Sequence, residues 1–241
     1  YQRMALKHSK EIIICEPIDL SRFSRTICQA EARKVLGVSE YSKVVLYPGG
    51  MVPIKGIASF VEAVPAIRAR VPELFCLMPF SAYTPSSDPK HVMRRKLANA
   101  FGIYSFGQQI EKRISESEIA DILFRTGYRT DMELFMAAAD VVVVPHMAPH
   151  FSRAVAEAGA MGKPVVAFRI GGVEEAVDDN ETGFLVEAGD VGQLASKTAL
   201  LLSNPDLAVQ MGDRGHEKAV ERYDAQNHAD TVMGFYDRVL G

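Results

Sequence analysis

The strongest constraint on the fold is a series of short, almost wholly apolar segments separated by helical patterns. They recur from residue 43 onward, and the run VVVV at Val141–Val144 is the clearest. Strands buried on both faces of a sheet read as such continuous runs, and the helices between them cover those faces. We therefore predict an α/β protein with a doubly wound, Rossmann-like parallel sheet. The predicted strands are Lys43–Tyr47, Leu74–Pro79, Ile122–Thr126, Val141–Val144 and Pro164–Ile170, with Gly183–Val186 as a short edge strand.

Helical patterns fill the intervals between these strands and continue beyond the last one. Three consecutive helices are predicted after the edge strand, so the sheet domain carries extra C-terminal helices. The predicted helices are Ile57–Arg70, Pro89–Phe101, Met132–Ala138, Ser152–Met161, Val173–Val177, Val191–Leu202, Asp206–Arg222 and Ala225–Leu240.

The first 40 residues do not fit this pattern. They hold one apolar segment, Glu11–Cys15, and a short helical pattern that ends near Gly37. A single strand cannot form a domain, so residues 1–40 are predicted to be the end of a preceding domain and a linker. Residues 41–222 form the predicted Rossmann-like domain, and 223–241 a separate C-terminal helix. Because the sequence begins at Tyr1 inside what reads as ordinary protein sequence, we expect a fragment.

Composition excludes several classes of partner. A formal net charge of −3 over 241 residues gives no general attraction to nucleic acid or anionic lipid. The three cysteines are widely spaced and form no CxxC pattern, which argues against a disulfide framework or a zinc site and favours a reducing cytoplasm. No apolar run approaches the roughly 20 residues that span a bilayer. We expect a cytoplasmic protein without a metal centre.

The segment Val141–Val166 carries the most specific functional signal. Its strand ends at Pro145, a loop with two histidines follows, and a small-residue helix then holds Glu157 as the only acid between Asp140 and Glu174. A carboxylate near the C-terminal end of a buried strand lies where open α/β sheets bind ligands. The alternative is an ion pair between Glu157 and Arg153 one turn earlier, worth a few tenths of a kcal/mol.

Two glycine-containing junctions could bind phosphate. In PGGMVPIKG, residues 48–56, glycines and Lys55 precede a helix, and in RIGGVEE, residues 169–175, Gly171 and Gly172 precede a predicted short helix. Helix N-termini with exposed backbone N–H groups attract anions, so the two junctions could hold a diphosphate without metal. The alternative is that Lys55 is a solvated surface residue and that the glycines only form tight turns.

Taken together, these motifs resemble the C-terminal, nucleotide-sugar-binding domain of GT-B fold glycosyltransferases of family GT4, a retaining group. The resemblance runs through PGGMVPIKG, TGYRTDMELFMAAADVVVVP, FSRAVAEAGAMGKPVVAFRIGGVEEAV and DDNETGFLVEAGD to the final helices, from about Ser9 onward. KEIIICEPIDLSRF is similar to the family's interdomain connection. The resemblance implies a missing N-terminal, acceptor-binding domain, to which any peripheral membrane contact would belong, and a last helix that crosses back onto it.

The resemblance also implies roles for individual residues. Lys55 matches the lysine that contacts the donor's phosphates, and Glu157 the second glutamate of the E-x7-E motif, which binds the ribose. Gly127–Arg129 match the segment whose backbone meets the base, and Gly171–Val173 a loop whose amides approach phosphate or sugar. No cofactor other than the nucleoside-diphosphate sugar is expected. The expected donor-binding residues are Gly49, Gly50, Lys55, Gly127, Tyr128, Arg129, His150, Phe151, Ser152, Arg153, Glu157, Gly171, Gly172 and Val173, with Lys55 as the catalytic residue.

Two positions depart from the family pattern. Gly50 stands where an arginine usually follows the loop glycine, and Pro149 stands where the first glutamate of E-x7-E contacts the donor sugar. Either the sugar is held differently, for example by His146 or His150, or this copy is catalytically degenerate. Three hypotheses follow: the donor domain of an active retaining transferase, a degenerate partner subunit, and a sugar-nucleotide epimerase of the same fold. The base, the sugar and the acceptor are left open.

Overall fold

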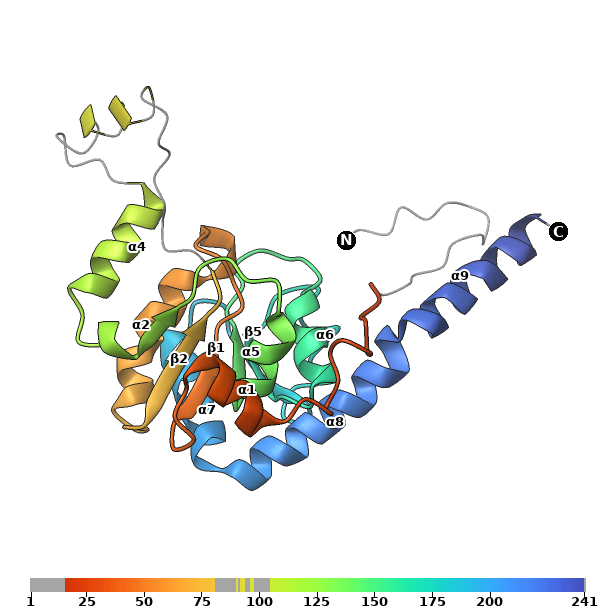
Figure 1. Cartoon of the computed structure of the whole chain (residues 1–241). Helices are drawn as coiled ribbons and strands as arrows, with labels where there is room; N and C mark the ends of the chain where they lie inside the picture. The colour runs from red at the N-terminus through yellow and green to blue at the C-terminus, as the bar shows by residue number, and fades with distance from the viewer. Residues whose placement is uncertain (1–15, 81–89, 91, 94–95, 98–104, 241) are drawn as a thin grey trace.

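A central parallel sheet organises the chain (Figure 1). The computed structural model describes residues 16–80, 90, 92–93, 96–97 and 105–240. In this part of the chain six strands pair in the order β3-β2-β1-β4-β5-β6, and every pairing is parallel. The strands are β1 (Lys43–Leu46), β2 (Leu74–Met78), β3 (Leu123–Arg125), β4 (Val141–Val144), β5 (Val165–Phe168) and β6 (Gly183–Val186).

Successive residues of each strand pack into two separate hydrophobic layers. In β1, Val45 faces one layer, whereas Val44 and Leu46 face the other. The first layer is closed by α2 (Ile57–Arg68), α4 (Phe106–Ser115) and α7 (Val191–Ser203), and the second by α1 (Gln29–Leu36), α5 (Met132–Ala138) and α6 (Arg153–Ala160). Both faces of the sheet are therefore apolar, which is why the strands read as continuous hydrophobic runs.

The long helix α8 (Pro205–Tyr223) connects the two layers. Its first turns pack into the first layer through Met211, and its last turns into the second through Ala219 and Tyr223. At its end the chain meets the N-terminal segment, because the Ile18 backbone N–H donates to the Tyr223 carbonyl at 2.7 Å. The final helix α9 (Ala225–Leu240) then extends away from the sheet (Figure 1).

The predicted fold class is confirmed: a doubly wound parallel sheet with extra C-terminal helices. The predicted strands match the observed ones to within two residues at each end, β6 is an edge strand, and the short helix near Gly37 is α1. The predicted strand Glu11–Cys15 lies outside the described residues, as does most of the predicted helix Pro89–Phe101.

The predicted helix Val173–Val177 is wrong. The structure has a series of turns there, in which Val173 N–H donates to Ile170 and Ala176 N–H to Val173, both at 3.0 Å. Gly172 has φ +88°, a left-handed conformation that excludes Gly172 itself from a helix, and the residues after it form turns and no regular helix. The junction after β5 therefore lacks the helix N-terminus that was expected there.

The sequence prediction missed helix α4. Its signal was present, because Ser105 and Gln108 form a capping box in which each side chain accepts from the other's backbone N–H. A serine followed three residues later by glutamine is a readable start of a helix.

Candidate functional site

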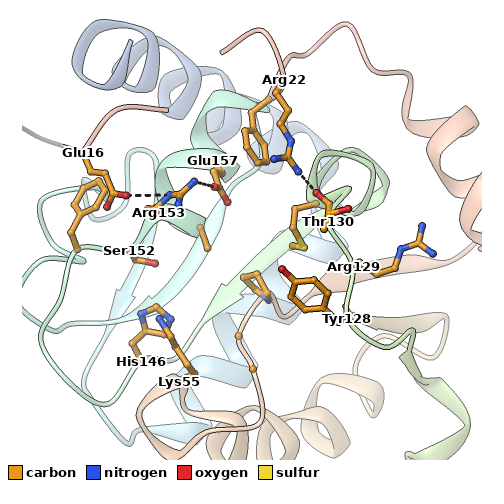
Figure 2. Close-up of a pocket in the computed structure, with 17 residues that line it drawn as sticks. Glu16, Arg22, Lys55, Tyr128, Arg129, Thr130, His146, Ser152, Arg153 and Glu157 are labelled. Carbon is orange, nitrogen blue, oxygen red and sulfur yellow. Dashed lines mark hydrogen bonds and ion pairs between the residues drawn. The ribbon is translucent and has the colours of Figure 1, made fainter. Parts of the chain in front are cut away.

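A cavity of about 540 Å³ opens at the carboxyl ends of β1 and β4 (Figure 2). From β1 the chain proceeds to β2 and β3 on one side of the sheet, and it then returns to β4, β5 and β6 on the other. The two neighbouring strands β1 and β4 thus flank the point where the strand order reverses. Crevices at such points are where open α/β sheets bind ligands.

The loop from Pro48 to Gly56 forms one wall, and the buried Tyr47 fixes its shape. The Tyr47 hydroxyl donates to the carbonyl oxygens of Gly50 at 3.2 Å and Lys55 at 3.0 Å, while its ring stacks on Phe60 at 4.8 Å. Gly49 lies against this hydroxyl, where an added Cβ would come within 2.4 Å. A single phenol therefore holds both ends of the segment that carries Lys55.

The loop after β4 is tied to the Lys55 loop. The Met147 backbone N–H donates to the Ile54 carbonyl at 2.8 Å. Gly56 has φ +72°, and an added Cβ would lie 1.7 Å from the Pro145 carbonyl oxygen. Only glycine permits this approach, so the two loops flanking the strand reversal form one unit.

Lys55 and two histidines form a basic cluster within this unit. The Lys55 ammonium lies 2.9 Å from His150 Nε2, and the rings of His146 and His150 stack with their centroids 4.3 Å apart. His146 is only 3% exposed, and its Nδ1 has no hydrogen-bond partner among the described residues. Burial, with the Lys55 charge and His150 adding to it, lowers the pKa of His146 to about 3. Burial also lowers the pKa of Lys55.

Helix α6 forms the next wall of the cavity and places Glu157 in it. Ser152 stands at the N-cap position without making the usual side-chain cap bond, and its buried Oγ has no partner in the described residues. Arg153 lies between two carboxylates, 3.4 Å from Glu16 and 3.4 Å from Glu157 (Figure 2). Glu157 is 9% exposed, and its burial raises the pKa of its carboxyl group against the opposing effect of Arg153.

The opposite wall comes from the loop after β3 and from the N-terminal segment. Tyr128 is 82% exposed at the cavity, and Arg129 is paired with Asp131 through an Nε–Oδ1 bond of 2.8 Å. Arg22 donates to the Thr130 carbonyl and pairs with Glu133 at 2.7 Å. The segment before α1 is thereby fixed against the cavity.

The structure brings most of the expected donor-binding residues together. Those that line the cavity are Gly49, Gly50, Lys55, Tyr128, Arg129, Phe151, Ser152, Arg153 and Glu157. The others, Gly127, His150, Gly171, Gly172 and Val173, lie outside its lining, although His150 contacts Lys55. Val173 is fully buried, and Gly172 packs against the backbone of His150, 2.5 Å from an added Cβ.

Sequence reasoning did not place the N-terminal segment at the site. Glu16, Arg22 and Phe23 line the cavity although they lie more than 100 residues from α6 in the chain. The available signal was the motif EPIDLSRF, which was interpreted only as a connection between domains. Further lining residues outside the expected set are Pro48, Thr130, Met132, His146 and Ala154, of which His146 had been considered as an alternative sugar contact.

The fold is that of an α/β protein with a cavity at the strand reversal, and the comparison with known families names the class. The model for "Glycosyl transferases group 1" matches residues 42–204, so the chain belongs to this family. The resemblance inferred from the sequence motifs is thereby confirmed.

Individual relatives match the chain over most of its length. It is 33% identical over 193 residues to D-inositol 3-phosphate glycosyltransferase of Corynebacterium efficiens, covering 78% of this chain and 41% of that protein. It is 31% identical over 228 residues to D-inositol 3-phosphate glycosyltransferase 2 of Catenulispora acidiphila, covering 92% and 49%. The chain thus spans less than half the length of these two relatives.

Solved structures match the fold. Sucrose-phosphate synthase from Thermosynechococcus elongatus superposes with a TM-score of 0.77 at 26% identity, covering 95% of this chain and 52% of that one. HepE of Anabaena in complex with UDP gives 0.79 at 22% identity, covering 94% and 57%. Across the described residues, no helix is long and apolar enough to cross a membrane.

Proposed function

We propose that this chain is the donor-binding domain of a retaining glycosyltransferase, which transfers a sugar from a nucleoside-diphosphate sugar to a hydroxyl acceptor. The observation that carries the proposal is the cavity at the strand reversal, where Lys55 and the N-terminus of α6 meet the buried Glu157. Membership of the glycosyltransferase family supports it, as does the UDP complex of the structural neighbour HepE. The rest of the enzyme would include an N-terminal domain that binds the acceptor.

The geometry suggests how the parts of the donor would be arranged. Lys55 supplies a cation for the diphosphate, and the first turn of α6, whose Arg153 and Ala154 line the cavity, supplies backbone N–H groups. Glu157 would accept hydrogen bonds from the ribose hydroxyls, since it is a buried carboxylate whose one ion pair among the described residues is a long contact of 3.4 Å to Arg153 on its own helix. The base would lie against the segment Gly127–Arg129, near the exposed Tyr128.

The chemical demand on such a site is charge stabilisation. When the bond between the anomeric carbon and the phosphate oxygen breaks, the leaving diphosphate gains negative charge, and preorganised donors stabilise it. Lys55 is placed for this role by its loop. Retention would follow from attack of the acceptor hydroxyl on the face that the phosphate leaves, with groups of the acceptor domain taking part. The chain by itself is therefore expected to bind the donor with little or no transfer.

A degenerate partner subunit is the second candidate, and Gly50 is the observation that favours it. Gly50 lines the cavity without a side chain, and an added Cβ there would meet nothing within 4 Å. Space for a second cation is therefore present but unused. In that case Gly50→Arg with Pro149→Glu should raise the affinity for a sugar nucleotide relative to its diphosphate. In an active enzyme tuned to another donor, the double variant should not improve that ratio.

Calorimetric titration with UDP, GDP and ADP tests the proposed site. Lys55→Met should weaken the nucleoside diphosphate that binds by about tenfold or more, because a charge-assisted hydrogen bond contributes about 1.5–3 kcal/mol. Glu157→Gln should weaken nucleosides with a ribose more than it weakens pyrophosphate. Lys34→Met, at an exposed lysine on α1, is the matched control. Unchanged affinity in both cavity variants would overturn the site.

A further inference from the structure

The hydrogen bonds of His150 define its protonation state. Its Nδ1 lies 2.8 Å from the Ala148 carbonyl oxygen, which can only accept, so Nδ1 carries the proton. Its Nε2 lies 2.9 Å from the Lys55 ammonium, which can only donate, so Nε2 presents its lone pair. His150 is thus a neutral imidazole that accepts a hydrogen bond from Lys55.

The imidazole is itself held in place from two sides. His146 stacks on its ring at 4.3 Å, and because the pKa of the buried His146 falls to about 3, this neighbour adds no competing charge near neutral pH. Behind it, Gly172 approaches the His150 backbone so closely that an added Cβ would lie 2.5 Å from the carbonyl carbon. The acceptor for Lys55 is therefore part of the rigid loop unit at the strand reversal.

We propose that His150 is a positioning residue, which holds the Lys55 ammonium in the orientation that binds the diphosphate of the donor. The inference rests on the proposed function and deepens it. A lysine side chain has many rotamers, and fixing it costs free energy that ligand binding otherwise has to supply. The bond to Nε2 uses one N–H of Lys55 and leaves two for phosphate oxygens.

The same bond has a consequence for the pH dependence of binding. Burial lowers the pKa of Lys55, whereas a hydrogen bond accepted from its charged form opposes that change. Loss of the His150 acceptor should therefore lower the pKa further, so that diphosphate affinity declines at a less alkaline pH. Besides Lys55, His150 and His146, the ionisable groups around the cavity are Glu16, Arg22, Tyr128, Arg129, Arg153 and Glu157, which the variants below leave unchanged.

Two substitutions distinguish the role of His150 as a hydrogen-bond acceptor from the role of its ring in stacking. His150→Phe keeps a flat ring for the stack on His146 but removes the acceptor, and His150→Gln places an amide oxygen near the position of Nε2. Each is combined with Lys55→Met, and the full chain is titrated with UDP, GDP and ADP from pH 7 to about pH 10. We expect His150→Phe to weaken the diphosphate that binds by about three- to tenfold, the effect of freeing one long side chain.

Three further comparisons test whether His150 acts through Lys55. His150→Gln should restore affinity to within about twofold of the wild type, and His150→Phe should have no further effect when Lys55 is already Met. The alkaline decline in affinity should begin at lower pH in His150→Phe only. Equal losses in the Phe variant with and without Lys55, or no rescue by Gln, would overturn the inference while leaving the proposed function intact. Absence of binding by all three nucleotides would overturn both.

Discussion

The two edges of the sheet each hold a partly buried lysine, and the two lysines are used in opposite ways. At the amino-terminal edge, Lys163 donates to the carbonyls of Ala137 and Ala139, both at 2.9 Å, beside an Asp140 that pairs with Arg33 at 2.8 Å. At the carboxyl edge, the Lys55 ammonium lies 2.9 Å from His150 Nε2 and faces an open cavity. Burial lowers the pKa of both ammonium groups.

The two edges differ in whether their buried polar groups have hydrogen-bond partners within the protein. The Asp140 network also receives the Val44 backbone N–H at 2.7 Å and a bond from Gln29, so its polar groups are taken up by protein partners. At the cavity, by contrast, His146 Nδ1 and Ser152 Oγ are buried without a partner in the described residues. Unsatisfied buried groups cost stability, and they persist where a ligand can satisfy them.

Two glycines, one at each edge of the sheet, should show the largest difference in the free energy of unfolding when they are replaced. Gly56 and Gly37 share a left-handed backbone, but an added Cβ lies 1.7 Å from the Pro145 oxygen at Gly56 and meets nothing within 4 Å at Gly37. Gly56→Ala should lower the free energy of unfolding by about 3 kcal/mol or more, and Gly37→Ala by about 1 kcal/mol. Urea denaturation measures both, and equal losses would contradict the tight contact between the two loops.

The substitutions of the two lysines should show the next largest difference in the free energy of unfolding. Lys163→Met removes the side-chain donor to the Ala137 carbonyl and one of two donors to the Ala139 carbonyl, which keeps Gln29, so the free energy of unfolding should fall by about 2 kcal/mol. Lys55→Met removes a group that faces the cavity, and the change should stay within about 0.5 kcal/mol. Chemical denaturation at pH 7 gives both values. A larger loss of unfolding free energy from Lys55→Met than from Lys163→Met would contradict the view that Lys163 stabilises the fold and Lys55 does not.

The titration of Lys163 offers a smaller and more specific effect. Its pKa in the folded protein is about 8, against an ordinary value of 10.5. Between these values the unfolded chain keeps a proton that the folded protein has released. The free energy of unfolding should therefore rise with pH across that window, with a slope of up to about 1.4 kcal/mol per pH unit. Because other groups also titrate, the quantity to measure is the difference in the free energy of unfolding between wild type and Lys163→Met. A difference that stays constant from pH 8 to 10.5 would contradict the lowered pKa of Lys163.

Glu157 should give the smallest change in stability. Burial raises its pKa, so the group stabilises the fold when protonated, and that contribution is lost as pH rises through the folded-state pKa. At neutral pH, Glu157→Gln should consequently raise the free energy of unfolding by about 0.5 kcal/mol, a gain typical of relieving strain at a binding site. Glu62→Gln, at an exposed carboxylate on α2, serves as the control in thermal denaturation. Destabilisation by Glu157→Gln would indicate that the Arg153 pair dominates instead.

The sequence by itself determined the sheet and the edge at which the cavity lies. Continuous runs such as Val141–Val144 can be satisfied only in strands covered on both faces, and the helices between them require parallel connections. That pattern places Lys55 and the α6 segment with Glu157 after the carboxyl ends of parallel strands, so their position at one edge of the sheet could be predicted. These features are local in the chain, and their physical cause is burial.

Tertiary structure decided the parts that depend on contacts between distant segments. Nothing local indicates that Glu16 and Arg22 pack against the cavity, because their position follows from the pairing of Ile18 with the end of α8. The close approach of the turn at Gly172 to the His150 backbone is likewise a contact between separate segments of the chain. For the same reason His150 could be predicted as a ligand contact but not as the acceptor behind Lys55. Hydrogen-bond partners 95 residues apart are set by packing, which a one-dimensional pattern does not contain.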